Sequence, residues 1–183
     1  MAKRTKVTRR TGTRISGDGN QDWRTPPELV EAVVRLFGPI DFDLAAATSD
    51  DAIAQHFFAP EDDALKQSWT GIGRNLWLNP PFDFVGDPQE PGGKCFAQKC
   101  WEEAEHLEPD QRIILLVRAS VGSNWFCQWV HNSAEIITLN GRVKFVGAKH
   151  PMNADLVLAV FHPKRRSVGF RTWSWKDPAA VPR

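Results

Sequence analysis

The sequence lacks several features that would each point to a particular class of protein. It has no tyrosine among its 183 residues, so no aromatic contact to a ligand can use a phenol hydroxyl. Its three cysteines, Cys95, Cys100 and Cys127, show no paired metal-binding spacing, so we expect reduced, buried thiols and no metal site. The 23 lysines and arginines barely outnumber the 22 aspartates and glutamates, which excludes a strong overall field for holding a polyanion.

Long apolar segments are also missing. No stretch approaches the length that spans a membrane, and no apolar segment follows the basic amino terminus as it would in a signal peptide. We therefore expect a cytoplasmic protein without a membrane partner, and we favour a monomer. The length suits one domain, placed at residues 22–183, after a flexible basic arm at residues 1–21. For the arm, a nucleic-acid contact and a disordered solubilising tail both remain open.

The pattern of apolar residues predicts strands that alternate with helices. The expected helices cover residues 26–37, 96–107 and 125–130, and the expected strands cover residues 41–46, 76–78, 112–117, 135–139 and 155–161. Residues 48–74 have weak periodicity and give no assignment. The alternation predicts an α/β fold of compact Rossmann-like type, with a mostly parallel central sheet and helices on both faces. Ligands bind such sheets beyond the carboxyl ends of strands, where Asp43 and Asn79 both fall.

The most informative motif is the run Asn79, Pro80, Pro81 and Phe82, which follows a short apolar strand. Two acceptors that hold both N–H bonds of an aromatic amino group draw its nitrogen towards a tetrahedral, reactive state. The Asn79 side-chain oxygen and the Pro80 carbonyl can be these acceptors. Pro81 fixes the backbone, and Phe82 offers a face for a flat ring to stack on. The alternative is a rigid Asn-Pro turn that ends a strand.

A second motif begins the first expected helix. Thr25 fits an N-cap, Pro26 the first helical position and Glu28 the reciprocal position of a capping box. This pattern starts a helix with or without a further role. The Thr25 hydroxyl and the N–H groups at the helix N-terminus can in addition bind a carboxylate.

Acidic and small residues follow on the second expected strand and beyond it. Asp41 and Asp43 alternate about one residue, so both point to one side of a strand, and Asp43 is the better ligand candidate. The residues from Ala45 to Ala47 leave room for a ligand near the backbone. Asp62 and Asp63 can accept hydrogen bonds from hydroxyl or amino groups, although a solvated acidic turn is equally compatible with them.

Taken together, these segments resemble the phage-type DNA N6-adenine methyltransferases. The resemblance spans roughly residues 22–161. It is carried by Trp23-x-Thr25-Pro26, Asp43-x-Ala45-Ala46, Ala59-Pro60-Glu61-Asp62-Asp63 with Trp69, Asn79-Pro80-Pro81-Phe82, Leu115-Leu116-Val117-Arg118 with Trp125-Phe126, and Gly141-Arg142-Val143-Lys144-Phe145. The order of Thr-Pro helix, cofactor strand and Asn-Pro-Pro-Phe is similar to that of gamma-type amino methyltransferases.

The resemblance implies transfer of a methyl group from S-adenosylmethionine to the amino group of adenine in DNA, with the base flipped into the site. It implies catalytic roles for Asn79, Pro80, Pro81 and Phe82, and cofactor contacts from Trp23, Thr25, Pro26, Asp43, Ala45, Asp62 and Asp63. Two departures stand out. The segment Leu44-Ala45-Ala46-Ala47 replaces a glycine-rich turn, and Phe82 stands where many relatives use tyrosine, which keeps stacking and removes a hydroxyl.

The expected partner is DNA, in the cytoplasm of a bacterial host, and the resemblance implies a phage or prophage origin. Candidate DNA contacts are the loop 83–93, His150, Arg118, Arg142, Lys144 and Lys149. For residues 141–144 a hairpin-like turn with exposed charges is the alternative. Trp125 and Trp129 are expected in the core. A methyltransferase acting on RNA or a protein glutamine amide, and a non-catalytic DNA-binding module, are the rival hypotheses.

Overall fold

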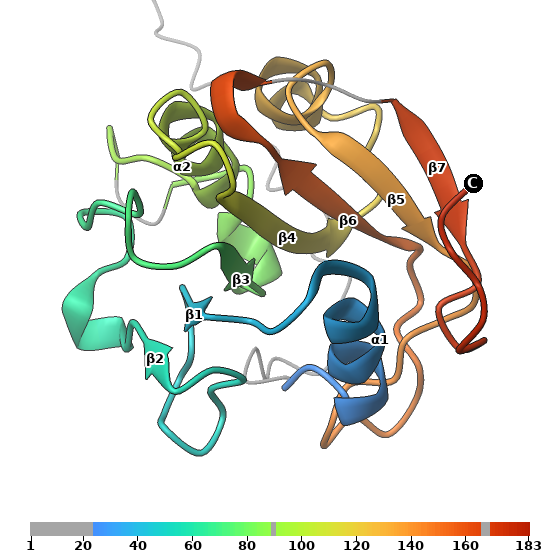
Figure 1. Cartoon of the computed structure of the whole chain (residues 1–183). Coiled ribbons are helices and arrows are strands. Elements are labelled where there is room, and N and C mark those ends of the chain that lie inside the picture. The colour runs from blue at the N-terminus through green and yellow to red at the C-terminus, as the bar shows by residue number, and fades with distance from the viewer. Residues whose placement is uncertain (1–23, 89–90, 166–168) are drawn as a thin grey trace, which may run out of the picture.

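The computed structural model describes residues 24–88, 91–165 and 169–183. In this part of the chain seven strands form one sheet in the order β2-β1-β3-β4-β6-β5-β7 (Figure 1). The strands are β1 Phe42–Asp43, β2 His56–Phe57, β3 Asn75–Leu78, β4 Arg112–Arg118, β5 Glu135–Leu139, β6 Leu156–Phe161 and β7 Phe170–Trp173. The arm at residues 1–21 and Trp23 lie outside the described residues.

The sheet is mostly parallel, as the sequence predicts. β1 pairs in parallel with β2 and β3, β3 with β4, and β5 with β7. β6 lies between β4 and β5 and is antiparallel to both. Because all the strands except β6 run in one direction, the carboxyl ends of β1, β3 and β4 meet at one edge of the sheet. Ligands bind at this edge in folds of this kind.

Helices cover both faces of the sheet, and this confirms the expected Rossmann-like α/β layering. Helix α1 (Pro27–Phe37) packs on one face, and helix α2 (Phe96–Glu103) packs on the other together with a π-helical turn at Phe126–Val130 (Figure 1). Side chains of β4 alternate between the two layers, since strand residues point to opposite faces in turn. Ile113, Leu115 and Val117 lie with α2, whereas Ile114 and Leu116 lie with α1.

The first helix begins one residue later than the predicted N-cap would place it, and that prediction is wrong. Pro26 is the N-cap, Pro27 is the first helical residue, and no side chain caps the helix, so the capping box of Thr25 and Glu28 does not form. A residue before proline is held in the extended region, and Pro26 with φ −66° and ψ 139° obeys this rule because Pro27 follows it. Its carbonyl accepts hydrogen bonds from the N–H groups of Leu29 and Val30.

The other differences lie where the sequence has little periodicity. β7 was not expected, because three of its four residues are exposed and only Trp173 reaches the core. The unassigned segment 48–74 contains the two-residue strand β2 and a 3-10 turn at Pro60–Asp62. Cys127 is exposed rather than buried, while Cys95 and Cys100 are buried as expected. No helix within the described ranges is long and apolar enough to cross a membrane.

Candidate active site

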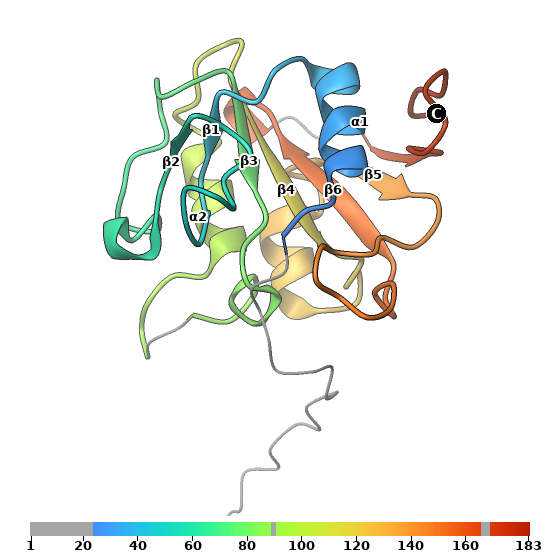
Figure 2. The same ribbon diagram turned by 90° about the horizontal axis from the view of Figure 1, so that it is seen from below.

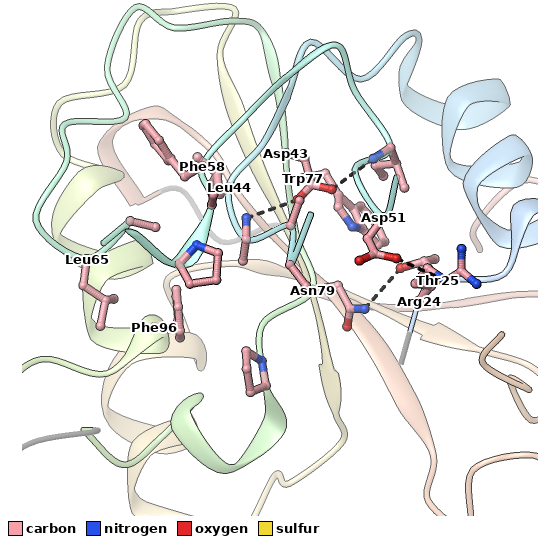
Figure 3. A pocket seen from close by; sticks show the side chains of 18 of the residues that line it. Arg24, Thr25, Asp43, Leu44, Asp51, Phe58, Leu65, Trp77, Asn79 and Phe96 are labelled. Atoms are coloured by element: carbon pink, nitrogen blue, oxygen red, sulfur yellow. Dashed lines mark hydrogen bonds and ion pairs between the residues drawn. The ribbon is translucent and has the colours of Figure 1, made fainter. Parts of the chain in front are cut away.

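A cleft of about 360 Å³ opens at the carboxyl ends of β1 and β3 (Figure 3). Its walls come from the segment entering α1, from the loop after β1, from residues 58–65 and from the end of β3. Asp43 and Asn79 both line it, which confirms that these two features share a cleft. The volume falls in the range of small-molecule sites, roughly 300–1,000 Å³.

Asp43 is the buried acid of the cleft, with 4 % of its surface exposed. One carboxylate oxygen accepts the N–H of Ala45 at 3.1 Å, and the other accepts the N–H of Ile53 at 3.1 Å. Burial raises the pKa of Asp43, and these two hydrogen bonds partly oppose the shift. The carboxylate therefore fixes the turn after β1 and the neighbouring loop in one arrangement beside the cleft.

The alanines after β1 form part of the cleft wall. Ala45, Ala46 and Ala47 all line it, and the backbone there is tied to both neighbouring strands. The N–H of Leu44 donates to the carbonyl of Trp77 at 2.8 Å, and that of Ala46 donates to Phe58 at 3.1 Å. Small side chains on a fixed backbone allow a ligand to approach closely without a glycine-rich turn.

Asn79 and Thr25 join the end of β3 to the start of α1. The Asn79 side-chain amide donates from Nδ2 to Oγ1 of Thr25, which is nearly buried, over 3.2 Å. Figure 3 shows the Asn79 oxygen on the side of the amide away from Thr25. The contact thus selects one orientation of the amide, and the predicted acceptor atom points away from the helix.

Phe82 follows Pro81, which lines the cleft, but does not line the cleft itself, and it begins a 3-10 turn at Phe82–Phe84. The Phe145 ring meets it edge-on, with centroids 6.0 Å apart and planes at 74°. The Arg118 guanidinium lies over the Phe82 ring, 5.2 Å from its centroid. The fold therefore brings together the Asn-Pro-Pro-Phe motif, the end of β4 and the segment after β5, which are far apart in the sequence.

The two acidic candidates near residue 60 behave differently. Asp63 lines the cleft and pairs with Lys66 at 2.7 Å. Asp62 does not line the cleft, and its carboxylate accepts the N–H of Ala59 at 2.8 Å, which closes the 3-10 turn. Pro26 is also absent from the lining, and Trp23 lies outside the described residues. Among the predicted cofactor residues, the cleft thus gathers Thr25, Asp43, Ala45 and Asp63.

Sequence reasoning missed an ion pair at the rim. Arg24 and Asp51 both line the cleft, with Nε of Arg24 3.3 Å from Oδ1 of Asp51. Thr48 donates from its hydroxyl to the other Asp51 oxygen at 2.7 Å. Arg24 stands inside the Trp-x-Thr-Pro motif, at the position left unspecified, whereas Asp51 falls in the segment without periodicity.

The basic candidates after β5 lie on the segment that connects β5 to the antiparallel β6, after a bend at residues 140–141. Arg142 and Lys144 are exposed and alternate with buried Val143 and Phe145, while Lys149 is exposed farther on. The Arg142 guanidinium donates to Asn153 Oδ1 at 2.5 Å and to the Met152 carbonyl at 3.3 Å.

This segment lies beside the start of α1. The N–H of Val146 donates to the Arg24 carbonyl at 3.0 Å, in an isolated antiparallel bridge. Figure 2 shows the corresponding orange loop next to the blue segment that enters α1. The basic residues after β5 are therefore carried on the side of the molecule where the cleft opens.

The chain is similar to known proteins in sequence. The model of the family "DNA N-6-adenine-methyltransferase (Dam)" matches residues 12–164. A DNA N-6-adenine-methyltransferase of Escherichia phage T1 is 31 % identical over 132 residues, which are 69 % of this chain and 50 % of that protein. The chain thus spans about half the length of this curated relative.

Two solved structures are also similar. One is the methyltransferase subunit of a type I restriction-modification system from Streptococcus thermophilus, with TM-score 0.47 and 13 % identity over 83 % of this chain and 47 % of that one. The other is the type IIL restriction-modification enzyme MmeI in complex with DNA, with TM-score 0.40 and 12 % identity over 70 % of this chain and 21 % of that one. From the match of the family model over most of its length, the chain belongs to the DNA N-6-adenine-methyltransferase (Dam) family.

Proposed function

We propose that the protein transfers a methyl group from S-adenosylmethionine to the N6 amino group of adenine in DNA. Membership of the Dam family supports the reaction class. The observation that carries the proposal is the contact of Asn79 with Thr25, since it orients the side-chain oxygen of Asn79 at the end of β3. An oxygen fixed in this way is suited to accept a hydrogen bond from an aromatic amino group.

The charged residues of the cleft suit S-adenosylmethionine. This molecule carries an ammonium, a sulfonium, a carboxylate, a ribose diol and an adenine ring. Three carboxylates line the cleft, from Asp43, Asp51 and Asp63, and they favour the cationic groups and the diol. Arg24 is the basic residue beside them and can hold the carboxylate together with the Thr25 hydroxyl.

The helix N-terminus contributes less to this carboxylate site than the sequence suggests. Pro26 and Pro27 have no N–H, and the N–H groups of Leu29 and Val30 bond to the Pro26 carbonyl. This leaves the N–H of Glu28 as the donor of the first turn. Arg24 is therefore the stronger candidate for the anionic group.

In the proposed reaction the target adenine leaves the duplex, at a cost of a few kcal/mol, and stacks on Phe82. Asn79 Oδ1 and the Pro80 carbonyl each accept one N–H of its amino group. S-adenosylmethionine supplies a methyl group activated by its sulfonium. The bond from N6 to the methyl carbon would form as the bond from carbon to sulfur breaks, which leaves a neutral thioether, and N6 would then release one proton to water. Positioning and the two acceptors account for the catalysis.

The test is methyl transfer from labelled S-adenosylmethionine to unmethylated DNA, with RNA and protein as parallel acceptors. We expect N6-methyladenine in DNA alone. Asn79→Ala should abolish the product, and Asn140→Ala, at an exposed asparagine after β5, should not. Label in RNA or in protein glutamine would leave the assignment of the cleft intact but would show that DNA is not the substrate. Absence of both transfer and S-adenosylmethionine binding would favour the non-catalytic DNA-binding module.

The proposed setting is the cytoplasm of a bacterial host, with DNA as the partner. The similarity to a protein of Escherichia phage T1 supports a phage or prophage origin.

A further inference from the structure

A second cavity, also of about 360 Å³, lies beside the cleft along the Asn-Pro-Pro-Phe motif. Pro81 lines the cleft, and the next residue, Phe82, lines the second cavity. The remaining walls come from the turn after Phe82, from the end of β4 and from Trp125. The motif therefore lies between the cleft and the second cavity. The reaction proposed above uses the cleft and the Phe82 ring, and it assigns no role to the rest of the second cavity.

The second cavity has the chemistry of a nucleobase site. Trp125 offers an aromatic surface, on which bases stack regardless of their identity, while the Phe82 ring lies under the Arg118 guanidinium. Arg118 supplies donors, which suit the O6 and N7 acceptors of guanine, and Asp83 and Asp87 supply acceptors, which suit the amino groups of cytosine or adenine. Two carboxylates disfavour a phosphate group, and the polar lining disfavours an apolar ligand.

The walls of this cavity are fixed by the fold. The Trp125 ring packs directly against the Gly86 backbone, since a Cβ placed on Gly86 would lie 2.1 Å from Trp125 Cδ1. Arg118 is the last residue of β4 and pairs with Leu156 of β6. The next residue, Ala119, donates its N–H to the Asp155 carbonyl at 2.9 Å. Side chains held on a strand end and a packed turn can select among bases, because their positions do not depend on the ligand.

We propose that this second cavity holds the nucleotide next to the target adenine and that Arg118 and Asp87 determine which base is accepted there. The inference rests on the proposed function, because it places the target adenine on Phe82. The neighbouring nucleotide is joined to the flipped adenosine by a single phosphodiester, so its base can reach a cavity that borders the Phe82 ring. The DNA contact predicted for Arg118 thereby becomes a specificity contact.

The test uses oligonucleotide duplexes in which one adenine is flanked by randomised bases. They are methylated to low conversion by the whole protein, and the sites of N6-methyladenine are sequenced. The wild-type protein should prefer particular bases directly beside the methylated adenine. Arg118→Met and Asp87→Asn should each change that preference by at least about fivefold and leave more distant positions unchanged.

The controls carry the same chemical changes far from the site. Arg35→Met, on the last turn of α1, and Asp110→Asn, in the exposed pair with Arg74, should reproduce the wild-type profile. A wild-type profile in both Arg118→Met and Asp87→Asn would overturn the inference. So would a wild-type protein without any preference at the neighbouring position.

A binding measurement separates this inference from the proposed function. With 2-aminopurine placed next to the target adenine, the wild-type protein should change its fluorescence, and Arg118→Met and Asp87→Asn should reduce the change. Equal signals in wild type and variants would overturn the inference even where a variant transfers no methyl group. DNA binding with the expected 2-aminopurine signals but without transfer in the wild type would instead contradict the proposed function alone.

Discussion

A buried ion pair on α2 holds one wall of the cleft, and breaking it should destabilise the protein strongly. Lys99 Nζ lies 2.6 Å from Glu103 Oε1, and both side chains are about 90 % buried, with 9 % and 11 % exposed. The other Glu103 oxygen accepts the N–H of Trp69 at 2.9 Å, and Trp69 Nε1 donates to the Ala64 carbonyl at 2.9 Å. Ala64 lines the cleft, so the ion pair anchors the cleft wall to α2.

Replacing Lys99 by Met keeps the volume and leaves the Glu103 carboxylate buried without its cation. Loss of one member of a buried pair costs about 3–5 kcal/mol. The double variant Lys99→Met with Glu103→Gln removes both charges, and the glutamine oxygen can still accept the Trp69 N–H. We expect the double variant to lose only about 1–2 kcal/mol, the scale of a weakened hydrogen bond to a charged group.

The assay is urea unfolding followed by circular dichroism, with the unfolding free energy extrapolated to water. Lys94→Met is the control, because its pair with Glu102 is half exposed, at 49 % and 30 %, and such pairs contribute at most about 1 kcal/mol. A double variant less stable than Lys99→Met would refute the reasoning. It would show that the buried, unpaired Glu103 carboxylate is not the cause of the destabilisation in Lys99→Met.

Three further predictions concern the cleft. Ala45→Phe should fill it and abolish binding of S-adenosylmethionine in calorimetry, whereas Ala45→Gly should still bind. Phe82→Ala should weaken binding of DNA that contains a mismatched target adenine by about 1–3 kcal/mol in fluorescence anisotropy, and Phe82→Tyr should retain it; unchanged affinity in Phe82→Ala would exclude stacking. Burial raises the pKa of Asp43 above its ordinary 3.8, so the stability that this group contributes is complete below that pH and is lost as the pH rises through the raised pKa. The stability of wild type relative to Asp43→Asn should therefore fall above pH 3.8, and a pH-independent difference would contradict the raised pKa.

The sequence predicts the elements whose patterns are set by burial. The helical period between Pro26 and Phe37, and the apolar runs of β4 and β6, each have one arrangement that buries their side chains, and the structure confirms them. β7 was not predicted because it is an exposed edge strand, and three of its four side chains are not required to be buried. The helix start was misplaced by one residue because two consecutive prolines satisfy the same local rule at adjacent positions.

The candidate site was predictable to the extent that the strand order is predictable. Placing Asp43 and Asn79 after parallel strands is enough to bring them into one cleft. The roles of Asp62 and Asp63 are not separable in the sequence, because only the geometry of the 3-10 turn directs one carboxylate to Ala59 and places the other beside the cleft. The pairing of Arg24 with Asp51 depends on a loop without periodicity and became visible only in the structure.

The most direct test of the central claim compares Asn79→Ala with the wild type in two measurements on the same preparation. One is the single-turnover rate of methyl transfer to adenine in DNA, and the other is the affinity for S-adenosylmethionine. If the oxygen that Thr25 orients is a catalytic acceptor, the rate should fall by about 100-fold or more while the affinity changes little. Equal losses of rate and affinity, or an unchanged rate, would contradict the role assigned to Asn79.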